Sequence, residues 1–384
     1  MTGAGTADGS APRRRILVVT VVHHPSDSRI RHREITALLA AGWEVTYAAP
    51  FSGYDAPLET DVPGLTCLDL PRAHGRRRFA AGRAARDLLR RHGGEYDIVL
   101  VHDPELLLAA TGLGLDHLVW DVHEDPAAAL AVKDWMPGPL RGVGATAWRR
   151  IERVAERRWP LLLAEHAYQE RFAQPHPVVP NTVRVPADAP PADRDSARVV
   201  YLGSVTLARG CAVMVDLARL LREASGGAIT VEVIGPAKDD ASAELLRAAS
   251  AEGLLTAHGF VPSDRALATL DGALCGLSLL ADLPNYRPSM PTKALEYLAH
   301  GVPVVTTPLP LAAELAESSG AGLVVPFDDA QAAADAVLHL WHHRDEAARM
   351  GRAGHAFVAQ RYDWTQQGPA FVAHLESLAA RHTP

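Results

Sequence analysis

The chain has 384 residues, of which 48% are hydrophobic and 22% are charged, and its net charge is −7 with neutral histidines. This composition is typical of a globular protein and excludes a disordered or fibrous chain. The length predicts two domains, because one hydrophobic core seldom extends over so many residues. The negative charge argues against a nucleic-acid partner, since binding a phosphate backbone requires clustered, unpaired cations.

The cysteines and the first residues of the sequence favour a cytoplasmic protein. Cys67, Cys211 and Cys275 are far apart and have apolar neighbours, which predicts neither a disulfide framework nor a metal site. Residues 1–14 are small and polar and lack the apolar segment of a signal peptide, so we expect a disordered tail and structure from about Arg15 onward.

Short apolar runs alternate with stretches of helical spacing along the whole chain, which is the pattern of βαβ units around a buried parallel sheet. The first series of runs comprises residues 16–22, 43–49, 96–102, 116–122 and 161–165. The second series comprises residues 198–204, 230–236, 274–280, 302–307 and 322–327. We therefore predict an α/β protein with two doubly wound parallel sheets.

A segment rich in Pro, Asp and small residues, from Asn181 to Ala197, separates the two series and fits neither period. It predicts an N-terminal domain over residues 15–182, a linker over 183–197 and a C-terminal domain over 198–361. Ligands of doubly wound sheets bind beyond the carboxyl ends of the strands, so functional residues are expected just after strands.

Two arginine-rich stretches run against the net charge, one from Arg72 to Arg91 and one from Arg141 to Arg158. A solvated helix face is the simpler interpretation of both. A weak peripheral membrane contact is the second interpretation. Neither stretch is apolar enough to span a bilayer.

The most informative segment runs from Asn285 to Pro308, where a polar loop precedes a helix and then a buried strand. Ser289 or Met290 is expected to cap this helix, and Gly301 suits its C-terminal end.

Backbone amides near Thr292 and Lys293 would then form an anion site suited to the diphosphate of a sugar nucleotide. Glu296, one turn further on, can accept hydrogen bonds from ribose hydroxyls. A surface ion pair between Lys293 and Glu296 explains the same spacing equally well.

The stretch PTKALEYLAHGVPVV resembles the donor-binding signature of retaining glycosyltransferases with the GT-B fold, of the family four type, the group 1 glycosyl transferases. Other segments resemble the same family in the same order: RIRHREITALLAAGWEVT, VHDPELLL, VWDVHED, VVPNTV, YLGSVTLARG and HGFVPSDRALATL. The resemblance continues to RYDWTQQ, at Arg361 to Gln367. It implies two Rossmann-like domains that face a central cleft, with a C-terminal helix over 362–384 that joins the first domain.

The resemblance also implies a reaction. A sugar is expected to pass from a UDP-, GDP- or dTDP-type nucleotide sugar to a hydroxyl of an acceptor, with retention of configuration. No cofactor is expected, because the nucleotide sugar is itself a substrate, and no metal is expected, because the sequence has no convincing metal site. The acceptor could be an envelope glycan, a lipid or a natural product, and no feature of the sequence predicts an oligomeric state.

Donor-side roles follow from the resemblance residue by residue. Glu296 resembles the ribose-binding glutamate of a paired motif, whereas Pro288 stands where the first glutamate of that motif is expected. Arg209 matches a cation on the diphosphate, and its usual arginine companion is replaced by Ser204, so Lys293 is expected to carry more of the charge. The complete donor-side set is Gly203, Ser204, Val261, Ser289, Thr292 and Glu296, with Arg209 and Lys293 as catalytic cations.

In the first domain, His123 resembles the family's cleft histidine, which contacts the donor sugar, and is the third catalytic candidate. A lone histidine after a strand is otherwise more often structural. Asp103 and Asp27 also fit as helix caps, and Glu124 also suits the start of a helix. The acceptor-side candidates are His23, His24, Asp27, Arg29, Asp103 and Glu124.

Two other functions remain open at this stage. A nucleotide-sugar 2-epimerase shares the architecture but would need acid–base carboxylates and no acceptor. A degenerate subunit that binds without turnover is supported by Pro288 alone. The one Asp-x-Asp motif, at Asp193 and Asp195, lies in the predicted linker and is expected to be solvated instead of holding a metal.

Overall fold

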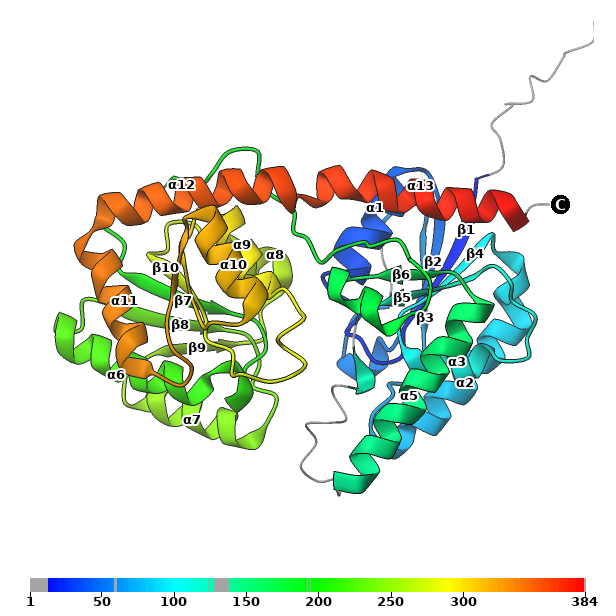
Figure 1. Ribbon diagram of the computed structural model, residues 1–384, viewed down its shortest axis with the longest axis horizontal. Coiled ribbons are helices and arrows are strands. Elements are labelled where there is room, and N and C mark those ends of the chain that lie inside the picture. The colour runs from blue at the N-terminus through cyan, green and yellow to red at the C-terminus, as the bar shows by residue number, and fades with distance from the viewer. Residues whose placement is uncertain are drawn as a thin grey trace, which may run out of the picture. The chain divides into compact units, whose positions relative to one another are not determined.

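The computed structural model describes residues 13–58, 61–123, 125–127, 138–191, 193 and 195–382 (Figure 1). The chain divides into two compact units. Unit 1 comprises residues 1–124, 148–179 and 368–384, and unit 2 comprises residues 125–147 and 180–367. Nearly all of the expected disordered tail lies outside the described residues, and the first strand begins at Arg15.

Unit 1 is built on a six-stranded parallel sheet of order β3-β2-β1-β4-β5-β6. The central strands β1, β4 and β5 are buried almost throughout because their residues are apolar on both faces. The bounds of the strands are β1 (Arg15–Val19), β2 (Glu44–Ala49), β3 (Leu65–Asp69), β4 (Ile98–Val101), β5 (Leu118–Val122) and β6 (Leu161–Leu163).

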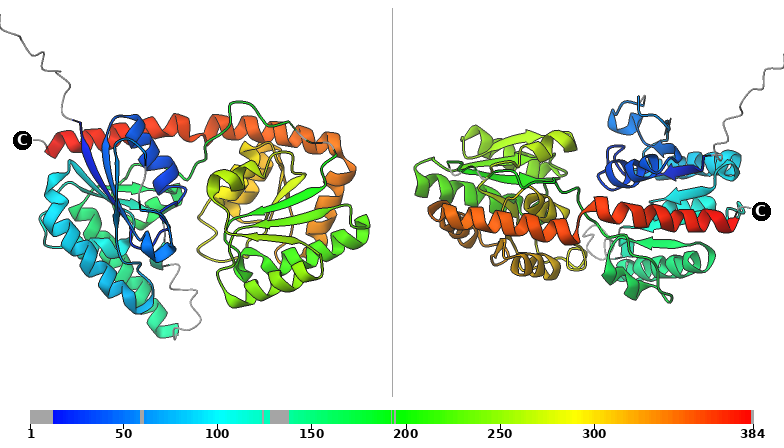
Figure 2. Two further views of the ribbon diagram at one scale, coloured as in Figure 1. Left: turned by 180° about the vertical axis from the view of Figure 1, so that it is seen from behind. Right: turned by 90° about the horizontal axis from the view of Figure 1, so that it is seen from above.

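Helices connect these strands and lie against the sheet, as Figure 2 shows. A π-helical segment (Ile30–Ile35) leads directly into the short helix α1 (Thr36–Ala40). The other helices that contribute to unit 1 are α2 (Arg78–His92), α3 (Pro104–Ala110), α5 (Gly138–Arg158) and α13 (Trp364–His382).

Unit 2 repeats the architecture of unit 1. Its parallel sheet has the order β12-β11-β10-β7-β8-β9. Its strands are β7 (Arg198–Leu202), β8 (Thr230–Ile234), β9 (Thr256–Gly259), β10 (Cys275–Ser278), β11 (Val304–Thr306) and β12 (Gly322–Val324). Its helices are α6 (Cys211–Ser225), α7 (Asp240–Ala251), α8 (Ser263–Ala268), α9 (Thr292–Ala299), α10 (Pro310–Ser319), α11 (Ala330–His342) and α12 (Arg344–Arg361).

The predicted α/β fold with two parallel sheets is confirmed, but two strands were not predicted. β3 and β9 are both edge strands, and most of their residues are exposed or half-buried. Such strands lack the continuous apolar run that marks a central parallel strand. Among the described helices, none has both the length and the apolarity needed to cross a membrane.

Candidate functional site

Four of the donor-side candidates lie close together where β7 ends, namely Gly203, Ser204, Arg209 and Lys293. Gly203 follows β7 with a φ of +112°, and its amide donates to the Ile234 carbonyl oxygen at 2.8 Å. A Cβ on Gly235 would lie 2.0 Å from the Gly203 carbonyl oxygen, so the loops after β7 and β8 pack backbone against backbone. Glycine is required there because no side chain fits between them.

Lys293 lies beside this loop. Its side chain is buried, with Nζ 3.6 Å from the centroid of the Tyr201 ring, and Nζ makes no hydrogen bond to any described residue. Burial, and then the charge of Arg209, hold the pKa of Lys293 well below its usual value. A buried amine without an acceptor is costly to charge, so an anion next to Nζ would stabilise its protonated form.

Arg209 is held in the loop between β7 and α6. The Thr206 hydroxyl accepts from the Arg209 amide at 3.1 Å, and Arg209 Nη1 lies 3.4 Å from the Ser204 carbonyl oxygen. Gly210 then takes a left-handed φ of +85°, where a Cβ would meet the Leu279 carbonyl oxygen at 2.3 Å. Arg209 is thus half-buried, and its side chain contacts the loop after β7.

Helix α9 begins differently from our expectation. Its N-cap is Pro291, which makes no side-chain cap hydrogen bond, and the Ser289 hydroxyl donates to the Asn285 carbonyl oxygen at 3.3 Å instead. The predicted cap by Ser289 or Met290 is therefore wrong, because the chain turns sharply before the proline. The N-terminus of α9 carries no side-chain cap that would compete with a bound anion.

Thr292 and Glu296 follow on α9, and both are half-buried. The interpretation of Lys293 and Glu296 as a surface pair does not hold, because Lys293 is only 9% exposed. Val261, after β9, is also half-buried and packs against the unit 2 core. Gly301, expected at the helix end, has a φ of +68° after α9.

Unit 1 contains a buried charged network around Arg29 and Asp121. Arg29 donates from Nε and Nη2 to the two oxygens of Asp121, each at 2.7 Å, and from Nη1 to the Val179 carbonyl oxygen at 2.9 Å. Glu34 Oε1 lies 3.0 Å from Arg29 Nε, but the geometry does not give a hydrogen bond. Arg29, proposed for the acceptor side, is thus enclosed and can act on an acceptor only through its neighbours.

Asp121 also orients two histidines. His102 Nδ1 and His123 Nδ1 each lie 3.1 Å from Asp121 Oδ2. Burial would raise the pKa of Asp121, but Arg29 and the two histidines hold it well below its usual value. Because an ionised carboxylate can only accept, both Nδ1 atoms carry protons, and the neutral His123 ring has its lone pair on Nε2.

His23 faces that lone pair. The Nε2 atoms of His23 and His123 are 2.9 Å apart, so one must donate to the other. Because Nε2 of the neutral His123 ring carries no proton, His23 Nε2 is the donor in this hydrogen bond. His23 Nε2 also lies 3.3 Å from Asp103 Oδ1, within ion-pair distance, and Asp103 Oδ1 makes no hydrogen bond to the described residues.

The alternative that the Asp103 side chain caps α3 is wrong. It stands at the N-cap position without a cap hydrogen bond. Its Oδ2 instead accepts from the Thr20 hydroxyl at 2.9 Å, from the Val22 amide at 3.2 Å and from the Val21 amide. These amides follow β1, where dinucleotide-binding sheets hold a phosphate, so Asp103 occupies the anion position of unit 1.

The remaining acceptor-side candidates have local partners. Asp27 Oδ1 accepts from the Arg29 and Ile30 amides at 2.8 and 3.1 Å, whereas the N-cap residue of the segment Ile30–Ile35 is Arg29. Burial would raise the pKa of Asp27, but His23 and His123 lower it. His24 Nδ1 accepts from the Ser26 amide at 3.0 Å. Glu124 lies outside the described residues.

Glu34, His102, Asp121 and Tyr201 were not predicted to be functional residues. Asp121 was detectable from the sequence, because a charged residue inside the apolar strand LVWDV indicates a buried charge. The groups His102, Asp121 and His123 each offer a ligand atom for a metal within 4.8 Å of one another. A cation fits poorly there, because Arg29 already occupies both oxygens of Asp121.

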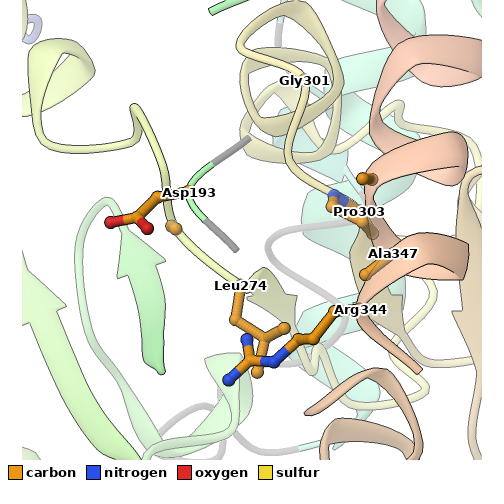
Figure 3. Close-up of a pocket in the computed structure, with 8 residues that line it drawn as sticks. Asp193, Leu274, Gly301, Pro303, Arg344 and Ala347 are labelled. Carbon is orange, nitrogen blue, oxygen red and sulfur yellow. The ribbon is translucent and has the colours of Figure 1, made fainter. Parts of the chain in front are cut away.

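Unit 2 also contains a small cavity that is not lined by any of the donor-side candidates (Figure 3). It measures about 20 Å³ and is lined by residues that include Asp193, Leu274, Pro303 and Arg344. Leu274 and Pro303 precede β10 and β11, so the cavity is at the amino ends of the strands. This volume holds about one water molecule, and ligands of such sheets bind at the opposite edge.

Comparisons with known proteins give a family match for part of the chain and similar structures for nearly all of it. Residues 196–343 match the family model of the group 1 glycosyl transferases. No curated protein matches the chain by sequence. Sucrose-phosphate synthase from Thermosynechococcus elongatus has a similar structure, with a TM-score of 0.74 and 16% identity over 96% of this chain and 100% of that chain.

Two further structures show the same fold. HepE of Anabaena in complex with UDP and glucose gives a TM-score of 0.67 and 12% identity over 95% of this chain and 100% of that chain. WaaG, a glycosyltransferase involved in lipopolysaccharide biosynthesis, gives a TM-score of 0.65 and 13% identity over 93% of this chain and 98% of that chain. Residues 196–343 therefore match the group 1 glycosyl transferases, and the chain has the GT-B fold of these structures.

Proposed function

We propose that the protein transfers a sugar from a nucleotide-diphosphate sugar of UDP, GDP or dTDP type to an acceptor hydroxyl, and that unit 2 binds the donor. The observation that carries this proposal is Lys293, a buried amine with no hydrogen bond to the described residues, beside Arg209 and the uncapped N-terminus of α9. A diphosphate supplies the negative charge that this cluster lacks. In unit 1 the corresponding position is filled by Asp103.

The same cluster suits the chemistry of the transfer. Negative charge grows on the leaving diphosphate as the bond to the anomeric carbon breaks, and Arg209, Lys293 and the amides of α9 would stabilise it. With these cations in place, we propose that turnover needs no metal. We further propose retention of configuration, with the acceptor attacking from the side of the leaving phosphate, which takes the acceptor proton.

We propose that unit 1 binds the acceptor, with His23 and His123 nearest to it. His123 is oriented by Asp121 and presents Nε2, which can accept a hydrogen bond from a sugar or acceptor hydroxyl in place of His23. An envelope glycan or lipid and a natural product are the acceptor classes that we propose. The three cysteines are free thiols, in keeping with a cytoplasmic location.

The decisive experiment incubates the purified protein with a panel of sugar nucleotides, with and without acceptors extracted from cells. Acceptor-dependent release of nucleotide is the expected result. Isomerisation of the donor without an acceptor would instead indicate an epimerase, and neither reaction would indicate a binding subunit. The same assay in EDTA tests the metal: if activity is lost and only a divalent ion restores it, the proposed role of the cations is wrong.

A weak contact of unit 1 with anionic membranes is a separate proposal. Phe79, at the start of α2, is 84% exposed, and the exposed residues Arg76, Arg77 and Arg83 surround it in sequence. An exposed aromatic ring among cations suits the interface of an anionic bilayer. Wild-type protein should sediment with phosphatidylglycerol vesicles at low salt, and Phe79→Ser should sediment less. Equal sedimentation of both variants would remove Phe79 from such a contact.

A further inference from the structure

A second group of metal-ligand side chains lies at the junction of α11 and α12 in unit 2. His339 is on the last turn of α11, His343 is the residue between the helices, and Glu346 is in the first turn of α12. Each side chain offers one ligand atom, and these atoms all lie within 4.8 Å of one another. None of the three belongs to the clusters described above.

His343 is oriented by the backbone. Its Nδ1 lies 2.8 Å from the His339 carbonyl oxygen, and a carbonyl can only accept, so Nδ1 carries a proton. The lone pair of the neutral ring is therefore on Nε2, the tautomer that binds a metal through Nε2. Metal-bound histidines commonly donate their other ring nitrogen in this way, which fixes the ring before the ion arrives.

The ligand atoms of His339 and Glu346 are close enough to bind the same ion. His339 Nε2 is 3.2 Å from Glu346 Oε2, and the His339 and His343 rings stack with centroids 4.3 Å apart. A carboxylate oxygen next to an imidazole nitrogen implies a proton between them. A cation can replace that proton and use both atoms as ligands.

The backbone holds the three side chains together. α11 ends at His342, and His343 leaves the helical region with a φ of −119° and a ψ of 60°. The amides of Glu346 and Ala347 donate to the His343 carbonyl oxygen at 2.9 and 3.0 Å. The neighbouring Arg344 donates to the Ser196 carbonyl oxygen and lines the small cavity with Asp193 and Leu274 (Figure 3).

We propose that His339, His343 and Glu346 bind a divalent transition-metal ion, with Zn²⁺ as the best match. Two imidazoles and one carboxylate are ligands typical of zinc, whereas Mg²⁺ and Ca²⁺ prefer oxygen ligands alone. Three protein ligands leave a coordination position for water. The ion would join the end of α11 to the start of α12, and this structural role is independent of the glycosyltransferase site.

The test uses the full chain, stripped of metal, in a calorimetric titration with Zn²⁺ alone. Wild-type protein should bind one ion at this junction, and His343→Gln and Glu346→Gln should each weaken that binding by at least about tenfold. His342→Gln is the matched control, since His342 is the exposed neighbour outside the group, and it should bind like wild type. Mg²⁺ should give no binding at this site.

Thermal unfolding supplies the second measurement. Zn²⁺ should raise the melting temperature of wild type and of His342→Gln but not of His343→Gln, and all three should melt alike in EDTA. Zn²⁺ binding that is equally strong in the double variant His343→Gln/Glu346→Gln, or no binding in wild type, would overturn the proposal. Turnover in EDTA should persist in wild type, which separates this site from the donor site.

Discussion

Arg29 in unit 1 and Lys293 in unit 2 are both buried basic side chains, but their surroundings differ. Arg29 donates to both oxygens of Asp121 and to a backbone carbonyl. Lys293 Nζ has an aromatic ring below it and no hydrogen-bond acceptor among the described residues. A compensated buried charge holds its unit together, whereas an uncompensated one destabilises the free protein and is stabilised by an anionic ligand.

The largest effect is expected for Arg29→Met. The substitution leaves Asp121 and Glu34 buried without their cation, which should lower the free energy of unfolding by about 3–5 kcal/mol. Urea denaturation followed by circular dichroism measures this. Arg90→Met, on the exposed face of α2, is the control and should change little. A loss below about 1 kcal/mol for Arg29→Met would mean that the network is not structural.

Lys293→Met should show the opposite pattern. Removing a buried amine that has no partner should leave the free energy of unfolding unchanged or raise it. Affinity for the nucleotide diphosphate should fall by roughly ten- to a hundredfold, because a charged hydrogen bond of about 1.5–3 kcal/mol is lost. Calorimetry with the wild type and with the exposed-surface control Arg219→Met makes the comparison. Unchanged affinity would exclude Lys293 from the donor site.

Glu296→Gln tests whether the ribose of the donor nucleotide binds at α9, the helix that also carries Lys293. If the carboxylate binds ribose hydroxyls, donor affinity should fall by roughly ten- to a hundredfold, which corresponds to about 1.5–3 kcal/mol. The melting temperature without donor should stay near that of wild type, because Glu296 is only half-buried. Turnover at low donor concentration should fall in parallel. A folded variant with wild-type donor affinity would show that the nucleotide lies elsewhere.

The last prediction concerns the pH dependence of stability and Glu34. Burial, and then the charge of Asp121, raise the pKa of Glu34 from 4.5 to about 8. The folded state thus binds this proton more tightly than the unfolded state, so the stabilisation is present below the unfolded pKa and is lost as pH rises through the folded pKa. Between pH 5 and 9, wild-type stability should fall relative to Glu34→Gln, which cannot ionise. Parallel stability profiles of the two proteins would contradict this assignment.

The central strands were predictable because each is a short apolar run between turn signals, as in RILVV and RVVYL. β3 and β9 were not, because an edge strand with exposed residues carries little apolar pattern. Loop-to-helix spacing located Lys293 and Glu296 on α9, but it misplaced the cap, because Pro291 occupies the N-cap position.

The network of unit 1 was largely beyond sequence reasoning. Arg29 and Asp121 are 92 positions apart, and their contact depends on how the loop after β1 meets the end of β5. Spacing made a cap the simpler interpretation of Asp103, but tertiary structure provided better donors in the amides after β1. Local patterns therefore predict where a residue lies more readily than which distant group it contacts.

Unit 1 consists of segments that are far apart in the sequence, and this affects the order in which the two units fold during synthesis. Its last segment, residues 368–384, follows the whole of unit 2 in the chain and includes Phe371 and Leu375, which are 1% and 0% exposed. On the ribosome, unit 2 is therefore fully synthesised before the helix that completes unit 1 emerges. Domains usually fold in the order of synthesis. Here we expect unit 2 to reach its native state first, while the unfinished unit 1 keeps apolar surface exposed to chaperones until α13 arrives.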